Sequence, residues 1–191
     1  IKTSQIVSNC DDDIMRMLNS TFDDFTDSNL DLYPVELRSG IDEINDLIYS
    51  NVNDGVYRSG FATTQNAYEA AVHKLFETLD LLESRLSEHR YLTGNRLTEA
   101  DWRLFPTLIR FDAVYHGHFK CNLKRIIDYP NLYGYMCDLY HHDGVAETVD
   151  FDHIKRHYYM THPEINPTKI VPVGPSFAFD ASHNRAHLSN N

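Results

Sequence analysis

The chain has 191 residues, of which 42% are hydrophobic, and a formal net charge of −11 at pH 7. This apolar fraction excludes global disorder, and the negative charge argues against nucleic acid or an anionic membrane surface as the main partner. The three cysteines stand far apart with no C-x-x-C pair. We therefore expect no disulfide framework and a reducing compartment, either the cytoplasm or the mitochondrial matrix. No apolar run approaches the ~20 residues that span a bilayer, so no membrane insertion is expected.

The N-terminal segment combines a short alternating stretch with a helix signal. Residues 1–9 alternate partly between apolar and polar side chains and are interpreted as an edge strand or the end of a strand. Acidic residues 11–13 then suit the positive end of a helix dipole, so we expect a helix over 11–25. The polar stretch 26–34 is interpreted as a linker. Because Ile1 is not a natural start, we expect a chain that is incomplete or processed at its N-terminus.

Helical spacing of apolar residues dominates the rest of the chain, with an irregular link at 55–64. Prolines at 163, 167, 172 and 175 exclude a long helix in the last part, so that tail must be extended, packed on the surface or mobile. The expected fold class is therefore all-α. The expected helices are 35–53, 65–88, one beginning at Thr98, 129–140 and 150–160.

The helix beginning at Thr98 carries a complete start signal. Thr98 is the expected N-cap and Asp101 stands three residues on, so each side chain can satisfy a backbone N–H of the other residue. Leu97 and Trp102 are placed to close a hydrophobic staple around the cap. We expect Asp101 to be buried and bonded to backbone N–H at this helix start.

Tyrosine is unusually frequent, with twelve residues. Tyr57 lies in the irregular link, and Tyr158 follows His157 at the end of an expected helix. A tyrosine hydroxyl can donate a hydrogen bond to a developing phenolate or thiolate, while the ring offers an apolar face to an aromatic substrate. The residue pattern alone favours the alternative that these tyrosines are amphipathic residues at helix ends.

Other candidate groups give weaker patterns. His153 and His157 stand four apart on one expected helix face, as a metal-ligand pair would, but no convincing third ligand follows and no metal site is predicted. Cys10 precedes a helix start that could lower its pKa, although the adjacent aspartates oppose this. Arg110 and Asp112 are too close in sequence to face each other on a helix, so they either line a cleft or make separate contacts.

Several runs of the sequence carry a family resemblance. Tyr-Leu-Thr-Gly-Asn followed by the Thr-Glu-Ala-Asp box resembles the helical domain of glutathione transferases. Val-Tyr-Arg-Ser-Gly-Phe-Ala over 56–62 and Asp-His-Ile-Lys-Arg-His-Tyr over 152–158 resemble the glutathionyl-hydroquinone reductases, the Xi-class branch of these enzymes. The resemblance covers nearly the whole chain. The matching runs are 53–71, 89–101, 108–115, 118–121, 129–134, 149–159 and 165–168.

The resemblance implies a C-terminal helical bundle of a glutathione transferase with a remnant of an N-terminal thioredoxin-like α/β domain. Residues 1–25 would end the thioredoxin-like domain, 35–162 would form the helical domain and 163–191 the extended tail. In the family, a cysteine of a Cys-Pro motif attacks the glutathionyl sulfur of a glutathionyl-hydroquinone, and a second glutathione resolves the mixed disulfide by thiol exchange. No cysteine here precedes a proline, so we expect no turnover by this chain alone.

The resemblance also assigns site residues. Tyr57 and Tyr158 match the family tyrosines that bind or protonate the phenolic oxygen, so we expect their hydroxyls to meet across a cleft that opens toward residues 1–19. Tyr115 and His157 are the further candidates for binding the substrate. The expected partners are quinone-type molecules and glutathione as co-substrate, in a homodimer or as a subunit of a complex.

One departure from the family concerns the glutathione site. Where the family has Ser-Asn-Glu-Ser, this chain has Ser-Asn followed by Cys10 and Asp11. Asp11 still offers oxygens to an ammonium group but would repel the γ-glutamyl carboxylate. The alternative is therefore a non-catalytic relative that serves as a scaffold or assembly subunit.

Overall fold

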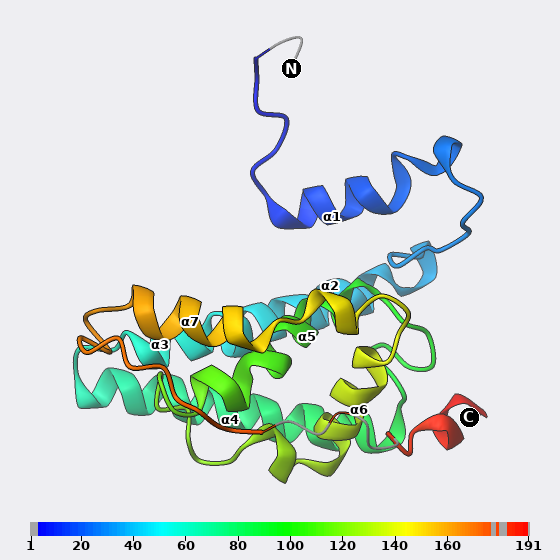
Figure 1. Cartoon of the computed structure of the whole chain (residues 1–191). Coiled ribbons are helices and arrows are strands. Elements are labelled where there is room, and N and C mark those ends of the chain that lie inside the picture. The colour runs from blue at the N-terminus through cyan, green and yellow to red at the C-terminus, as the bar shows by residue number, and fades with distance from the viewer. Residues whose placement is uncertain (1–3, 177–178, 180–182, 191) are drawn as a thin grey trace.

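The computed structural model describes residues 4–176, 179 and 183–190. Within these residues every regular element is helical, and the one β-bridge joins Tyr91 to Gly94. The longer helices after the N-terminal segment form one bundle, while α1 lies outside it at the end of a long connection (Figure 1). The helices are α1 Asp11–Ser20, α2 Arg38–Ile48, α3 Gly55–Gly60, α4 Gln65–Glu88, α5 Glu99–Arg110, α6 Pro130–Tyr140 and α7 Phe151–Thr161.

The N-terminal segment differs from the sequence-based expectation. No strand forms over residues 4–9, where Ile6 and Val7 are 84% and 88% exposed. A strand requires a neighbouring backbone to bond its N–H and C=O groups, and none of the described residues lies beside this segment as a sheet. The expected helix over 11–25 ends at Ser20, and only a short 3-10 turn follows at Asp23–Phe25.

The link over 55–64 was expected to be irregular; this prediction holds for residues 61–64 and is wrong for residues 55–60. A π-helical turn at Tyr49–Asn53 carries the chain from α2 directly into α3, so Tyr57 lies on a helix. Asp54 contributes at this joint: its N–H donates to Tyr49 O at 2.9 Å, and its carboxylate pairs with Arg58 at 3.0 Å. Asp54-Gly55 is a local stop signal, but packing of the buried Gly55 and Val56 beside α4 overrides it.

The core of the bundle lies between α2, α4, α5 and α6. The stripe expected on α4 is buried, and α6 and α7 lie where the periodicity predicts them, within one or two residues at each end. The fully buried side chains include Ile41, Ile48, Leu75, Leu79, Leu82, Leu86, Leu104, Phe111, Phe119 and Tyr135.

Asp101 confirms the expected cap and does more than a cap requires. It is fully buried, and its carboxylate accepts hydrogen bonds from Thr98 N at 2.8 Å and Leu92 N at 2.9 Å. The hydroxyl of Tyr135 donates a further bond at 2.7 Å, which joins α5 to α6. Burial raises the pKa of Asp101, against the effect of these bonds.

The described part of the C-terminal tail packs on the bundle. Arg185 is 3% exposed, and its guanidinium donates to the carbonyl oxygens of Leu86, His89 and Arg90 at 2.7 to 3.0 Å. These carbonyls lie at the C-terminal end of α4, where helix carbonyls lack partners within the helix. The tail therefore caps the longest helix of the bundle, and no sequence pattern had indicated this.

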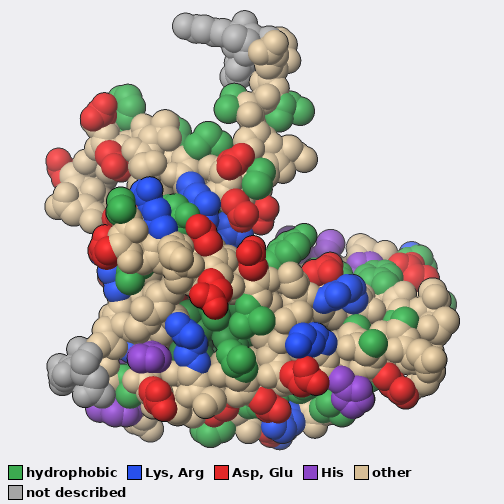
Figure 2. All heavy atoms as spheres, turned by 180° about the vertical axis from the view of Figure 1, so that it is seen from behind, with side chains coloured by type: hydrophobic (Ala, Val, Ile, Leu, Met, Phe, Trp, Pro, Cys, Tyr) green, Lys and Arg blue, Asp and Glu red, His purple; other side chains and the backbone are tan. Residues whose placement is uncertain are grey.

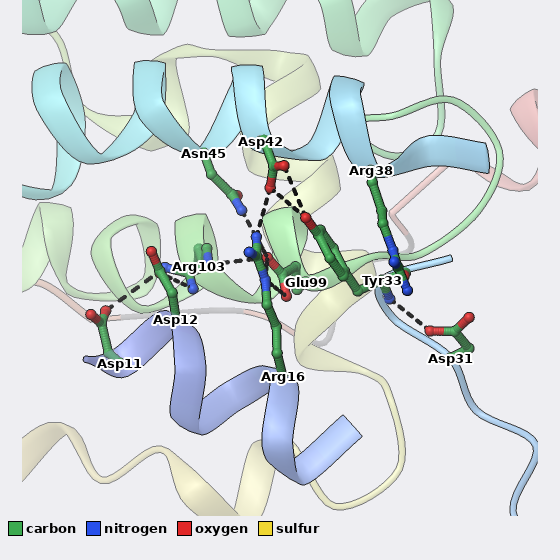
Figure 3. Close-up of polar contacts among 10 residues, drawn as sticks. All are labelled: Asp11, Asp12, Arg16, Asp31, Tyr33, Arg38, Asp42, Asn45, Glu99 and Arg103. Atoms are coloured by element: carbon green, nitrogen blue, oxygen red, sulfur yellow. Dashed lines mark hydrogen bonds and ion pairs between the residues drawn. The ribbon is translucent and has the colours of Figure 1, made fainter. Parts of the chain in front are cut away.

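α1 has no buried residue, so apolar packing does not hold it to the bundle. Ion pairs and hydrogen bonds attach it instead. Arg16 donates to Glu99 at 2.9 Å and to Asp42 at 2.6 Å, and Asn45 donates to the same Glu99 carboxylate at 3.0 Å (Figure 3). Glu99 lies 2% exposed at the start of α5, where a carboxylate suits the helix dipole. Basic and acidic side chains gather where the α1 segment meets the body (Figure 2).

Asp101→Ala should destabilise the fold far beyond the loss of an ordinary cap. The substitution leaves two buried backbone N–H groups and the Tyr135 hydroxyl without partners. We expect a loss of at least about 3 kcal/mol, because each such group costs ~1–3 kcal/mol. Asp128→Ala is the matched control, since Asp128 caps an exposed 3-10 turn and its loss should lower the urea midpoint far less. Equal urea midpoints for the two variants would contradict this account.

Candidate functional site

Three tyrosines from different elements meet at their hydroxyl groups. The Tyr57 hydroxyl on α3 lies 2.7 Å from that of Tyr158 on α7, although 101 positions separate the two residues. The hydroxyl of Tyr115, in the π-helical turn Phe111–Tyr115 after α5, lies 2.8 Å from Tyr158 on its other side. The expected approach of Tyr57 to Tyr158 is confirmed, and Tyr115 extends the pair into a chain of three.

Phe119 sets the positions of the tyrosine rings. Its ring centroid lies 5.4 Å from Tyr57, 5.5 Å from Tyr115 and 6.0 Å from Tyr158. Gly60 permits this packing, because a Cβ atom there would lie 2.3 Å from Phe119 Cγ. Neither Phe119 nor Gly60 was identified from the sequence, since a buried phenylalanine and a helical glycine carry no pattern that indicates a site.

Burial keeps the hydroxyls of Tyr115 and Tyr158 protonated. Tyr115 and Tyr158 are 3% and 6% exposed, and Tyr57 is 36% exposed. Burial raises the pKa of Tyr158 to about 12 and also raises the pKa of Tyr115. Three hydroxyls share two hydrogen bonds, so one O–H is left to donate. If the Tyr115 hydroxyl donates its hydrogen bond to Tyr158 and the Tyr158 hydroxyl donates to Tyr57, the O–H that is free to donate to a ligand is that of Tyr57, the most exposed of the three.

A cavity of about 500 Å³ adjoins the tyrosine chain. Its wall includes Tyr57, Tyr115 and Tyr158, together with Arg110 from α5 and His157 from α7. Tyr57 also borders a second hollow of about 440 Å³ whose wall includes Asp11 and Met15 of α1. The cleft therefore adjoins the α1 side of the molecule, as expected.

Of the remaining candidates from the sequence, His157 lines the cavity, whereas Cys10 and Asp11 do not. His157 lies in the cavity wall with His153, and its ring meets Tyr158 edge-on at 5.2 Å between centroids. Cys10 is exposed at the N-cap of α1 and lines neither hollow, and Asp11 pairs with Arg103 at 3.7 Å. Among the described residues, no group of three or more His, Cys, Asp and Glu is placed to hold a metal ion.

The two alternatives for Arg110 and Asp112 divide between them. Arg110 lines the cavity and donates to Pro106 O at 2.7 Å, while Asp112 makes a separate contact and accepts from Ile126 N at 2.7 Å. Cys121 and Cys137 are both buried. Burial raises the pKa of the Cys121 thiol to about 12, so it is not a reactive thiolate at neutral pH.

His118 lies beside Tyr158 and was not identified from the sequence. It is 5% exposed, and the backbone carbonyl of Tyr158 is near enough to act on its pKa. Its Nε2 lies 3.2 Å from Nδ1 of His162, and burial lowers its pKa to about 4, so it is neutral. Asn166 donates to the next carbonyl, that of Tyr159, at 2.7 Å. The bond from Asn166 satisfies a carbonyl near the end of α7 and so helps to hold the turn that follows Tyr158.

Comparison with known proteins shows that the chain is homologous to the C-terminal helical domain of glutathione transferases. Residues 65–136 match the glutathione S-transferase C-terminal domain. The chain is 58% identical over 172 residues to the glutathionyl-hydroquinone reductase PcpF of Sphingobium chlorophenolicum, covering 90% of this chain and 55% of that protein. The curated relatives are thus nearly twice as long as the matched region.

Solved structures give the same result for the fold. The glutathione-bound YqjG of Escherichia coli superimposes with a TM-score of 0.93 at 54% identity, over 96% of this chain and 60% of that chain. A Xi-class glutathione transferase from Natrialba magadii superimposes with a TM-score of 0.95 at 49% identity, over 98% and 57%. In the part of the chain that the structure describes, no helix has the length and apolarity needed to cross a membrane.

Gly60→Ala should disturb the tyrosine chain as well as the fold. The added methyl group would displace Phe119 and with it the three rings that it contacts. We expect a loss of ~1–3 kcal/mol, as for overpacked cores. Gly40→Ala is the control: it lies on α2 with open space around its Cβ position and should stabilise by about 1 kcal/mol. Thermal unfolding of both variants measures this, and a stabilised Gly60→Ala would contradict the close packing.

Proposed function

The chain is a homologue of the Xi-class glutathione transferases and glutathionyl-hydroquinone reductases that covers their C-terminal helical domain, and we propose that it forms the hydroquinone-binding half of such a reductase. The supporting observation is the hydroxyl chain of Tyr115, Tyr158 and Tyr57 at the wall of a cavity. A phenolic ligand requires a donor at its oxygen and an apolar wall for its ring, and these residues supply both.

The hydroxyl chain suits the step in which the hydroquinone leaves. The ring carbon that bears sulfur first takes up a proton from solvent while the neighbouring phenol loses one, which gives the keto tautomer. A cysteine thiolate then attacks the glutathionyl sulfur, the bond between sulfur and ring carbon breaks, and its electron pair restores the ring double bond and leaves the negative charge on the phenolic oxygen. Tyr57 would donate a hydrogen bond to that oxygen and stabilise the developing charge, and protonation of the oxygen completes the free hydroquinone. A second glutathione thiolate then cleaves the mixed disulfide, which releases glutathione disulfide and restores the cysteine.

We place the attacking cysteine in a thioredoxin-like domain that residues 1–25 would complete. α1 has no buried residue, and the apolar residues Ile14, Leu18 and Phe22 are 41%, 66% and 52% exposed. An amphipathic helix with an unburied apolar face is typical of an element whose packing partner lies elsewhere. A thioredoxin-like domain packed on this face would bring its active site to the α1 side, where the two hollows adjoin.

Glutathione is the proposed co-substrate. We further propose that the protein works in a reducing compartment and as a homodimer or a subunit of a larger complex. The homologous YqjG structure contains glutathione. In this chain Asp11 and Asp12 both pair with Arg103, so the residues at the start of α1 are engaged within the protein. If glutathione binding is lost, the same fold would act as the non-catalytic scaffold or assembly subunit.

Tyr57→Phe should weaken the binding of hydroquinone to the purified chain about fivefold to tenfold, since a hydrogen bond contributes ~1 kcal/mol or slightly more. Tyr68→Phe is the matched control, because its hydroxyl bonds Lys120 O outside the cavity and should leave the affinity unchanged. Ionisation of Tyr158 should cause no loss of affinity between about pH 6 and about pH 9, because burial raises the pKa of Tyr158 to about 12 and its hydroxyl remains protonated below that value. Calorimetric titration measures both effects, and equal affinities for the two variants would remove the proposed role of Tyr57.

The chain alone should show no glutathione-dependent cleavage of a glutathionyl-hydroquinone. None of its cysteines precedes a proline, two of them are buried, and Cys10 lies outside both hollows. Measurable turnover that Cys10→Ser abolishes would make Cys10 the nucleophile and would contradict this prediction.

A further inference from the structure

Arg110 brings a fixed positive charge to the wall of the tyrosine cavity. It lies in the last turn of α5, and one of its guanidinium N–H groups donates to Pro106 O at 2.7 Å. A guanidinium carries five N–H donors, so this bond anchors the side chain and leaves donors free for a ligand. Pro106 lines the same cavity, so the anchored group is held at the wall.

Arg110 has no acidic partner among the described residues, although acidic residues outnumber lysine and arginine by 28 to 17. In this part of the chain no carboxylate lies within ion-pair distance of Arg110, a feature that it shares with Arg38, Arg85 and Arg185; of these four arginines, Arg110 lines the tyrosine cavity. The described arginines that do approach a carboxylate are Arg16, Arg58, Arg90, Arg96, Arg103, Arg125 and Arg156.

The cavity wall as a whole offers donors and no carboxylate among the residues described. His153 and His157 of α7 line it beside Arg110, and the three tyrosines supply the hydroxyl chain. The charge of Arg110 also acts on the tyrosines, because it lowers the pKa of Tyr158 against the larger effect of burial. An anionic group in this cavity would therefore meet a guanidinium, two imidazoles and no repelling charge.

We propose that Arg110, with His153 and His157, makes this cavity selective for phenols that carry a second, anionic oxygen group. The inference rests on the proposed function, in which the phenolic oxygen is held by Tyr57, and adds the substrate class. Arg110 attracts the anion and donates to its oxygens, and the imidazoles donate further bonds. An aryl ligand with a carboxylate or an ionised second hydroxyl would place its phenolic oxygen at Tyr57 and its anionic group at Arg110 and the two histidines.

The test compares two ligands of nearly the same shape on the purified chain. The ligand 4-hydroxybenzoate carries a carboxylate and 4-hydroxybenzamide a neutral amide, while both keep the phenol. We expect the benzoate to bind about tenfold more tightly, and Arg110→Gln to reduce the ratio of the two affinities to about one. Arg156→Gln is the matched control and should keep the tenfold ratio, since Arg156 lies on α7 but pairs with Asp152 and does not line the cavity.

The outcomes separate this inference from the proposed function. If benzamide binding depends on Tyr57 but the benzoate has no advantage, or if Arg110→Gln keeps the preference, the anion site is wrong and the phenol site stands. If neither ligand binds in a way that Tyr57→Phe weakens, the phenol site is wrong and the anion site with it. An Arg110→Lys variant that keeps part of the preference would further support the role of the positive charge.

Discussion

The site depends on one hydrogen-bonded chain, in which the Tyr158 hydroxyl stands between those of Tyr115 and Tyr57. Hydroxyl groups 2.7 and 2.8 Å apart tolerate little displacement, so α3, the turn after α5 and α7 must keep a common arrangement. Burial of the inner two tyrosines raises their pKa values and keeps them as neutral donors. The exposed member of the chain then presents the donor to a ligand.

The rest of the bundle holds those three elements in place. Asp101 fixes the start of α5 and ties it to α6 through Tyr135, while Phe119 fills the space among the tyrosine rings. His118 lies beside Tyr158 and pairs with His162 near the end of α7. The buried groups that support the site are thus hydrogen-bonded, as buried polar groups must be to avoid a large desolvation cost.

Local sequence patterns correctly predicted the helices that bury a regular apolar stripe or begin with a capping signal. The stripe on α4 and the box from Thr98 to Asp101 are local patterns, and the structure confirms both. α3 was missed because Asp54-Gly55 ends a helix locally, while packing against α4 continues it. The strand expected over residues 1–9 does not form in residues 4–9, because a strand depends on a partner that local sequence cannot supply.

The candidate site could be predicted only in part, and for a different reason. The residue pattern alone favoured structural tyrosines, and the family resemblance singled out Tyr57 and Tyr158. Phe119, Gly60 and His118 carry no sequence pattern of their own, since their roles arise from contacts between distant segments. Arg185 was missed likewise, because its partners lie almost a hundred positions away.

A crystal structure of the chain with bound hydroquinone tests the central claim most directly. The account predicts one phenolic oxygen at about 2.5–3.0 Å from the Tyr57 hydroxyl, with the ring in the cavity beside Tyr158 and Arg110. A hydroquinone bound elsewhere, or bound in the cavity with neither oxygen on a tyrosine hydroxyl, would contradict it.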